Sequence, residues 1–454
     1  MVHTFEYSHK GEKFYFLWDV ESASLSIVDY AAFLCAKKRY SELNEDEESA
    51  FSHIPQDEKS EIIAELERAE CEGALNGKPL ISEFKKNTDT VKALCLHICH
   101  DCNLSCDYCF AGGGTYHSER DYMSAEVGKK AIDFLIKNSG SRRNLEVDFF
   151  GGEPLMNLSV VKQIVSYARG IEKEFEKNFC FTMTTNCLLL NDENIEYLNK
   201  EMENVVLSVD GRECVHNAVR HTKNGKNAFD LILSNALKMR KARGDKKYYV
   251  RGTFTAKNLD FSDDVLFLND AGFDQISVEP VVLSDGHPLA IKEEHLAKIL
   301  DEYDKFTENY LERRKSGKWF NFFHFMIDLE HGPCSNKRLT GCGAGTEYLA
   351  VTPNGDIYPC HQFAGLENFR IGNVSDGIKR NEIREEFAAN CVLGKKHCEN
   401  CFAKYFCGGG CAANAYNFSG KLTGQYEIGC ELTKKRLELS LAIAAIEKYV
   451  KAES

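Results

Sequence analysis

The stretch CLHICHDCNLSCDYCF, at residues 95–110, decides how the rest of this chain is interpreted. It contains two overlapping triads with the spacing C-x3-C-x2-C, namely Cys95, Cys99 and Cys102, and then Cys102, Cys106 and Cys109. Three thiolates at such spacings can bind three irons of a [4Fe–4S] cube and leave the fourth iron open. A structural zinc site or buried thiols would also fit one isolated triad.

The two triads differ in the segments that carry them. Cys95 and Cys99 alternate with apolar residues inside residues 91–99, a pattern that predicts a strand, so the sheet would fix their side chains. Residues 102–109 follow the strand end, where a loop can fold around a cluster, and a glycine run follows at residues 112–114. We therefore expect the second triad to bind the cluster.

Strand-like runs alternate with helical patterns over residues 91–281, and one of the helices is predicted to begin at Ser124 as its N-cap. The runs are VKALCLHIC, LEVDFF, CFTMTTN, VVLSVD, YYVRGTFT and QISVEPV. Six such β–α units predict a parallel sheet with helices outside it. A closed barrel needs eight strands, so the expected fold class is α/β, with an open, partial (β/α)6 barrel and an active site at the carboxyl ends of the strands.

The flanking segments have different patterns. Residues 1–85 begin with short β-type runs and continue with helical stretches, and a polar linker is predicted at residues 76–90. After a predicted helix at residues 292–315, turn residues dominate, and we expect metal ligation rather than a large apolar core to hold this part. A last amphipathic helix is predicted over residues 432–450. The predicted domains are residues 1–87, 88–315 and 316–454.

Cysteine usage and charge exclude several classes of protein. The 454 residues include 19 cysteines, an odd number, and the start MVHTFEYSHKGEKF has no apolar export segment, so a secreted disulfide framework is a poor explanation. The net charge of −13 argues against a nucleic-acid or anionic-membrane binder. No run approaches the about 18 apolar residues of a membrane span. We expect a cytoplasmic protein whose clustered cysteines bind metal.

Residues at successive strand ends resemble those of the radical S-adenosylmethionine (radical SAM) superfamily. The second triad is followed by the aromatic Phe110, and the second predicted strand ends in Gly151-Gly152-Glu153-Pro154, which resembles the GGEP motif of that superfamily. The resemblance implies that S-adenosylmethionine (SAM) binds the open iron, that Phe110 packs on its adenine, and that Glu153 accepts hydrogen bonds from its amino group. Taken alone, the GGEP segment also fits a strand-end turn.

Two further strand ends fit the same resemblance. Asn186, after the third strand, would meet the ribose hydroxyls, but the superfamily commonly has glycine at the next position, where this chain has Cys187. After the fourth strand, Ser208 and Arg220 match positions that contact the cofactor carboxylate in related enzymes. Taken alone, Arg220 also fits a surface ion pair.

The later cysteines resemble the SPASM extension of radical SAM enzymes that modify peptides. The resemblance implies two auxiliary [4Fe–4S] clusters, hence three clusters in all, with Cys342, Cys360 and Cys411 on the first auxiliary cluster and Cys398, Cys401, Cys407 and Cys430 on the second. Either Cys334 is the eighth ligand, or the first auxiliary cluster keeps an open iron for a substrate thiol. Cys391 has no place in the pattern and is expected to be structural. Two zinc sites are the alternative.

The amino-terminal segment, with its predicted strands and helices, resembles the winged-helix-like recognition element of enzymes that modify ribosomal peptides. Such a unit binds a leader peptide as an added strand. Winged folds also bind DNA, but residues 42–72 are acidic, which argues against phosphate contact.

The chain as a whole, including HDCNLSCDYCFAGGGTY at residues 100–116, most resembles the maturases of six-cysteine (SCIFF) peptides. The resemblance implies an enzyme that joins a cysteine sulfur of a short precursor peptide to the α-carbon of an acceptor residue, forming a thioether (sactionine) link through a 5′-deoxyadenosyl radical. It also implies a leader on the peptide and an external one-electron donor of the flavodoxin or ferredoxin type. No residue is assigned as the base. The alternatives are another maturase of this architecture, forming formylglycine or a carbon–carbon link, and a non-catalytic iron–sulfur or zinc protein.

Overall fold

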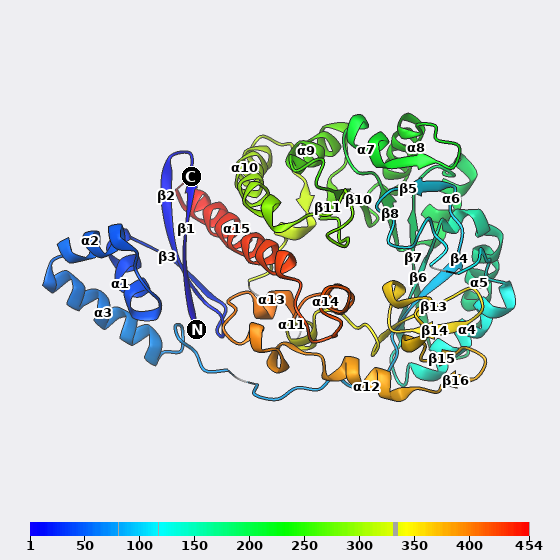
Figure 1. Ribbon diagram of the computed structural model, residues 1–454, viewed down its shortest axis with the longest axis horizontal. Helices are drawn as coiled ribbons and strands as arrows, with labels where there is room; N and C mark the ends of the chain where they lie inside the picture. The colour runs from blue at the N-terminus through cyan, green and yellow to red at the C-terminus, as the bar shows by residue number, and fades with distance from the viewer. Residues whose placement is uncertain (80, 117, 330–334, 454) are drawn as a thin grey trace.

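The computed structural model describes residues 1–79, 81–116, 118–329 and 335–453. Its central feature is a sheet in which parallel strands follow one another in chain order with helices between them (Figure 1). The strands are β4 (Ala93–Cys99), β6 (Asn144–Gly151), β7 (Asn178–Thr185), β8 (Asn204–Ser208), β10 (Tyr248–Phe254) and β11 (Gln275–Pro280). The helices between them are α4 (Ala125–Asn138), α5 (Leu158–Ile171), α6 (Asp192–Glu201), α7 (Glu213–Val219), α8 (Phe229–Arg243) and α9 (Phe261–Ala271). The predicted α/β fold with a large parallel sheet is confirmed.

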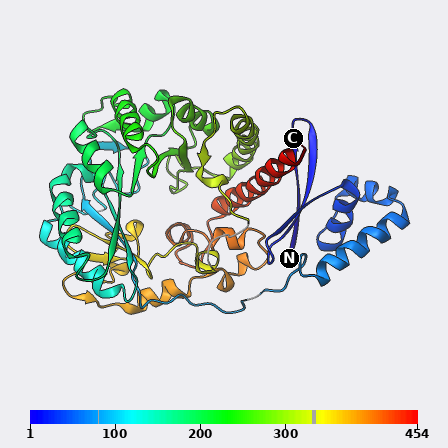
Figure 2. The same cartoon turned by 180° about the vertical axis from the view of Figure 1, so that it is seen from behind.

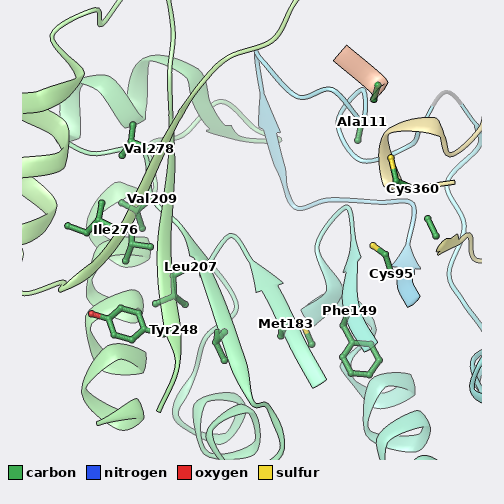
Figure 3. Packing of buried hydrophobic residues seen from close by; sticks show 14 of the residues in the cluster. Cys95, Ala111, Phe149, Met183, Leu207, Val209, Tyr248, Ile276, Val278 and Cys360 are labelled. Atoms are coloured by element: carbon green, nitrogen blue, oxygen red, sulfur yellow. The ribbon is translucent and has the colours of Figure 1, made fainter. Parts of the chain in front are cut away.

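Alternating apolar residues place one face of the strands against the helices. In β6 and β7 every second side chain is buried, including Phe149 and Met183, which join Leu207 of β8 in one apolar cluster (Figure 3). The first helix of this layer, α4, begins where the sequence predicts, because the Ser124 hydroxyl accepts a hydrogen bond from Val127 N at 3.2 Å.

The sheet continues beyond the predicted strands on both sides. Within the described residues it has 11 strands, and β12 (Asn321–Phe322) pairs in parallel with β11 at one edge. At the other edge β13 (Tyr348–Val351) pairs in parallel with β4 and is followed by antiparallel β14 (Asp356–Tyr358), β15 (Gly372–Asn373) and β16 (Gly377–Ile378). These added strands have two to four residues, too few to show a periodic pattern.

The amino-terminal segment forms a small antiparallel sheet followed by three helices. The sheet contains β1 (Val2–His9), β2 (Glu12–Asp19) and β3 (Ser24–Val28), and the helices are α1 (Tyr30–Tyr40), α2 (Glu45–His53) and α3 (Gln56–Cys71). Figures 1 and 2 show this sheet lying between α1–α3 on one side and the last helix, α15 (Glu427–Glu453), on the other. The His3 Nε2 atom lies 2.8 Å from Glu438 Oε1 of α15, and the Tyr7 hydroxyl donates to Glu308 Oε1 at 3.0 Å.

The carboxyl-terminal region differs from two expectations. Its helices are α10 (Leu296–Lys315), α11 (Ser335–Thr340), α12 (Asn381–Ala389), α13 (Lys404–Cys407), α14 (Ala412–Ser419) and α15. The start predicted for α15, residue 432, is wrong: the helix begins at Glu427 and contains Cys430, because Gly429 and polar neighbours hide its first turn from an apolar pattern. The expected lack of a large apolar core is also wrong, since Phe363, Phe369 and Phe387 belong to the main apolar cluster.

Among the residues that the structure describes, no helix combines the length and the apolar character that crossing a bilayer requires.

Candidate active site at the strand ends

The carboxyl ends of β4, β6, β7 and β8 surround a cavity of about 140 Å³. Every residue that the sequence assigns to the SAM-cleaving cluster and to SAM lines this one cavity: Cys102, Cys106, Cys109, Phe110, Gly151, Gly152, Glu153, Asn186, Ser208 and Arg220. Thus residues that are more than 100 positions apart in the chain come together at the edge of the sheet where parallel α/β folds place their ligands.

A short strand pair holds the cysteine loop in place. Strand β5 (Leu104–Cys106) pairs in antiparallel fashion with β9 (Arg220–Thr222), and this register sets Cys106 opposite Arg220. Burial raises the pKa of the Cys102 thiol to about 12 and that of Cys106 to about 11. These thiols are therefore protonated unless a cation such as iron lies beside them.

The alternative triad is placed differently. Cys95 and Cys99 lie within β4, are fully buried, and do not line the cavity. The Cys99 thiol donates to the carbonyl oxygens of Asp101 at 3.2 Å and Glu153 at 3.1 Å. The geometry therefore favours the second triad. Within the described residues, no three Cys, His, Asp or Glu side chains converge on a point suited to one metal ion, whereas a cube distributes its ligands over several irons.

Gly151 and Gly152 allow β6 to end directly against the backbone that follows β4. A Cβ atom on Gly152 would lie 1.9 Å from the Asp101 carbonyl oxygen, and one on Gly151, whose φ is +121°, would lie 2.3 Å from that of Cys99. In the same contact Glu153 N donates to the Asp101 carbonyl at 2.9 Å. Both glycines are needed for this close approach, which carries Glu153 into the cavity wall.

The Glu153 carboxylate is 1% exposed and is held from two strand ends. It accepts hydrogen bonds from Thr185 Oγ1 at 2.9 Å, Asn186 N at 2.7 Å and Leu155 N at 3.1 Å. Burial raises its pKa to about 7, while these hydrogen bonds act in the opposite direction. The group therefore lies close to the balance between its neutral and charged forms, and a cationic ligand would favour the charged one.

Asn186 is oriented by its neighbours on two loops. Its Nδ2 donates to Asn103 Oδ1 at 2.7 Å, and its Oδ1 accepts from Leu188 N at 3.0 Å. The next residue, Cys187, has a φ of +66°. This is the left-handed region that favours glycine, so the backbone would suit the glycine that the superfamily resemblance leads us to expect at this position.

Arg220 is not a surface residue, and the surface ion-pair alternative is wrong. It is 6% exposed, its Nη1 lies 3.4 Å from Asp210 Oδ1 and donates to the Tyr108 hydroxyl at 3.1 Å. Its Nε is buried without a hydrogen-bond partner among the described residues. An unpaired buried donor at a cavity wall fits an anionic ligand group.

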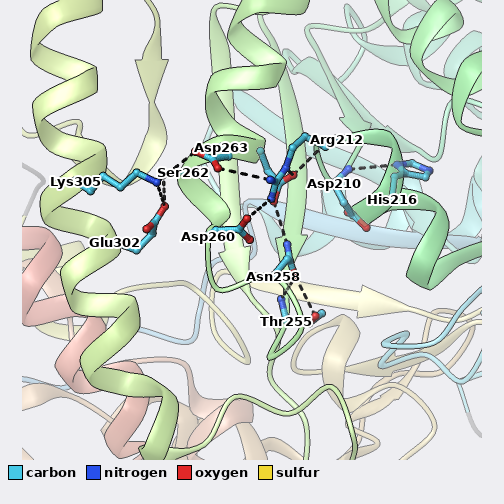
Figure 4. Close-up of polar contacts among 11 residues, drawn as sticks. Asp210, Arg212, His216, Thr255, Asn258, Asp260, Ser262, Asp263, Glu302 and Lys305 are labelled. Atoms are coloured by element: carbon cyan, nitrogen blue, oxygen red, sulfur yellow. Dashed lines mark hydrogen bonds and ion pairs between the residues drawn. The ribbon is translucent and has the colours of Figure 1, made fainter.

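Two residues that orient Arg220, Asp210 and Tyr108, are not predicted from the sequence. Asp210, which lies within the predicted fourth strand-end segment, and Tyr108, between two of the cysteines, could have been found as polar groups beside the motifs. Arg212 Nε donates to Asp264 Oδ1 at 2.8 Å. Arg212 Nη2 also lies 3.0 Å from Asp260 Oδ2 (Figure 4), and the two contacts together fix the turn after β8. A Cβ on Gly211 would lie 2.3 Å from the Cβ of Asp264, so the turn packs directly on α9.

Within each predicted auxiliary ligand set, the later cysteines lie near enough to one another to affect each other's pKa values. The pKa of Cys360 is raised to about 12, first by burial and then by the nearby thiols of Cys411 and Cys342. The pKa of Cys398 is raised to about 11, first by burial, with further contributions from its neighbours Cys407, Cys401 and Cys430. A second cavity, of about 210 Å³, is lined by Cys407, Cys411 and Cys430.

The structure bears on the prediction for Cys391 but not on that for Cys334. Cys391 is buried, and its thiol donates to the Phe84 carbonyl oxygen at 3.5 Å, a contact that suits a structural role. Cys334 lies outside the described residues, so the choice between an eighth thiolate and an open iron stays a prediction.

Comparisons with known proteins agree with this arrangement. Residues 90–228 match the model of a 4Fe-4S single cluster domain, and residues 342–402 match that of the SPASM iron-sulfur cluster-binding domain. The chain is 23% identical over 422 residues to the radical SAM cyclopropyl synthase TigE of Paramaledivibacter caminithermalis, covering 85% of this chain and 83% of that protein.

Solved structures show the same fold. Native anSMEcpe with bound AdoMet and the Cp18Cys peptide has a TM-score of 0.65 and 19% identity, covering 79% of this chain and 99% of that one. Streptococcus suis SuiB bound to precursor peptide SuiA has a TM-score of 0.52 and 17% identity, covering 91% and 96%. From the sheet, the strand-end cavity and these matches together, this chain has the radical SAM fold followed by a SPASM domain.

Proposed function

We propose that this protein is a radical SAM peptide maturase that joins a cysteine sulfur of a short, ribosomally made peptide to the α-carbon of an acceptor residue. The observation that carries the proposal is the single cavity in which all residues predicted for the SAM-cleaving cluster and for SAM meet. The thiols of Cys102, Cys106 and Cys109 would hold the SAM-cleaving [4Fe–4S] cluster. Bound together, this cluster and SAM supply a 5′-deoxyadenosyl radical, which removes a hydrogen atom from carbon.

The cavity residues would bind the ammonium and carboxylate groups on the methionine part of SAM, and its adenine. Glu153, whose carboxylate already accepts three hydrogen bonds from the protein, has remaining lone pairs for the SAM ammonium. Arg220 would use its unpaired Nε for the SAM carboxylate. The Phe110 ring, 44% exposed at the cavity, would pack on the adenine. Together these contacts would orient SAM and exclude water from the reacting end.

The amino-terminal sheet would bind the leader of the peptide. Strand β3 is an edge of this sheet within the described residues, so its outer backbone groups can pair with an added strand. The SuiB structure with its precursor peptide covers 91% of this chain, and the remaining 9% is less than half of residues 1–87. At least part of this amino-terminal unit therefore has a counterpart in a peptide-binding relative, which supports the proposal.

The thioether assignment rests on the resemblance of residues 100–116 and of the later cysteine spacings to SCIFF maturases. In the net reaction the α-carbon gives one hydrogen atom to the 5′-deoxyadenosyl radical, the thiol gives up its proton, and a sulfur–carbon bond forms. The one surplus electron would leave through the auxiliary clusters. An external one-electron donor would supply the electron for SAM cleavage. Within the described residues we assign no side chain as the base for the thiol.

The test is product analysis after anaerobic reaction with SAM, a reductant and a short cysteine-rich peptide encoded near this chain. A thioether product is lighter by two hydrogen atoms and has one fewer thiol that iodoacetamide can alkylate. A carbon–carbon link gives the same mass loss but keeps every thiol, and that outcome would contradict the thioether assignment. Absence of 5′-deoxyadenosine from the fully loaded protein would contradict a SAM-cleaving function altogether.

A further inference from the structure

One buried cation in the SPASM region has no carboxylate partner. Lys395 is 3% exposed, and its Nζ donates to the Gly409 carbonyl oxygen at 2.6 Å, inside the loop between Cys407 and Cys411. Within the described residues, the charged groups that act on this lysine are cysteine thiols, with no Asp or Glu among them. A buried ammonium normally requires an anionic partner, so this position lacks one as long as the thiols stay neutral.

The neighbours of Lys395 belong to both predicted sets of auxiliary ligands. Burial raises the pKa values of Cys398 and Cys407, of the second set, and of Cys411, of the first set, and the charge of Lys395 opposes this rise at all three thiols. The same side chain lines a small cavity together with Cys342, of the first set. Lys395 therefore lies between the two groups of thiols and faces members of each.

Two other buried lysines of this region differ from Lys395. The Nζ of Lys404 lies 2.9 Å from Glu21 Oε1, and that of Lys86 lies 3.3 Å from Glu347 Oε2. Both have a carboxylate counter-charge from the protein. The absence of such a partner thus distinguishes Lys395 from lysines of similar burial in the same part of the molecule.

We propose that Lys395 is the counter-charge shared by the two auxiliary clusters and that it holds their reduction potentials higher than a neutral residue would. This inference rests on the proposed function, since it requires iron–sulfur clusters on both sets of thiols. A cluster bound by thiolates is anionic, and reduction adds one more negative charge to it. A buried cation beside it favours the reduced form, because the two charges interact through a medium of low dielectric constant.

The experiment compares variants of the full, reconstituted chain in the Cys106→Ala background, where the auxiliary clusters alone contribute to the signal. Lys395→Gln keeps a donor for the Gly409 carbonyl and removes the charge, whereas Lys395→Arg keeps the charge. Lys404→Gln is the matched control, because its lysine has its own carboxylate. Each protein is titrated anaerobically with dithionite and mediators, and the reduced clusters are followed by electron paramagnetic resonance.

We expect Lys395→Gln to lower the equilibrium constant for reduction of an auxiliary cluster about tenfold, which is a shift of 59 mV to more negative potential for one electron. Lys395→Arg and Lys404→Gln should retain the parent potentials. A Gln variant with the full iron content and the parent potentials overturns the role of Lys395.

The iron content of each reconstituted variant distinguishes a lost charge from lost packing and from absent clusters. Loss of iron from the Gln variant but not from the Arg variant still supports a required charge, whereas loss from both assigns the lysine to packing and overturns the proposal. If the parent Cys106→Ala chain itself holds no auxiliary iron, the proposed clusters are wrong, which is a different failure.

Discussion

Cys187 keeps a backbone conformation that residues other than glycine rarely adopt. Its φ of +66° lies in the left-handed region, its amide donates to Thr185 Oγ1 at 3.1 Å, and its side chain is fully buried. The conformation positions Asn186 at the cavity. A residue with a Cβ adopts it at a cost of about 1–2 kcal/mol.

Replacing Cys187 by glycine should relieve this strain, whereas alanine should keep it. Both variants lose the buried thiol, so comparing them isolates the backbone. Glycine is ordinarily the less stable of the two by about 0.5–1 kcal/mol, because its unfolded chain is more flexible. Here we expect Cys187→Gly to be the more stable by about 0.5–1 kcal/mol in urea unfolding. A glycine variant less stable than the alanine variant would show that the strain is absent.

Single cysteine substitutions distinguish the two triads at residues 95–109, because only the triad that binds the cluster is needed for SAM cleavage. Cys106→Ala should reduce 5′-deoxyadenosine formation to background, because its thiol lines the cavity and would bind an iron. Cys95→Ala, which removes a thiol that is buried within β4, should keep the activity. The measurement is chromatography of the nucleoside after anaerobic incubation with SAM and dithionite. Activity that is lost in Cys95→Ala and kept in Cys106→Ala would assign the cluster to the first triad.

At the scale of elements, strand β3 is where we expect the leader to bind. Its Ile27 is 38% exposed, and an added strand would cover it. Ile27→Glu should weaken leader binding about tenfold, or about 1.4 kcal/mol, because a carboxylate would then be buried in the new pair. Fluorescence anisotropy of a labelled precursor peptide provides the measurement.

The chain offers a matched control for this variant. Ile63 of α3 belongs to the same amino-terminal unit and is 37% exposed, but it lies away from the strand edge on a helix. Ile63→Glu should bind the leader like the parent protein, and SAM cleavage without peptide should be unchanged in both variants. Equal weakening by the two substitutions would contradict binding at β3.

Helix α7 makes the fold sensitive to acid through His216. This side chain is fully buried and accepts a hydrogen bond from Asp210 N at its Nδ1, 3.4 Å away. Burial, with the nearby charge of Arg220, lowers its pKa to about 3. An unfolded chain takes up a proton at this histidine near pH 6.5, whereas the folded chain does so only near pH 3. Stability from this group is therefore present above pH 6.5 and is lost as the pH falls toward 3.

We expect His216→Asn to reduce the dependence of the unfolding free energy on pH between 6.5 and 4.5 by up to one proton, or about 1.4 kcal/mol per pH unit. Urea unfolding of the iron-free protein at several pH values measures this slope. Asn217→Ala, on the same helix, removes no titrating group and should leave the slope unchanged. An unaltered slope in His216→Asn would show that this histidine does not contribute.

For the whole molecule, the features that the sequence predicted are those that a short stretch of residues specifies by itself. The six parallel strands have five or more residues with regular apolar spacing, and the motifs at their ends occur in chain order. Strands β12 to β16 are shorter, and they form through pairing with segments far away in the chain, such as β13 with β4. The burial of Arg220 likewise depends on the pairing of β5 with β9, which no local pattern reveals.

The sheet between α1–α3 and α15 joins the first and last parts of the chain. Phe5, Phe14 and Trp18 of this sheet belong to the main apolar cluster together with Leu441 of α15. During synthesis these aromatic side chains emerge from the ribosome well before residues 427–453 do. The apolar face of the sheet that packs on α15 therefore stays uncovered until this helix has been made. Premature termination before α15 should give an aggregating fragment, because the aromatic side chains of the sheet would then stay exposed.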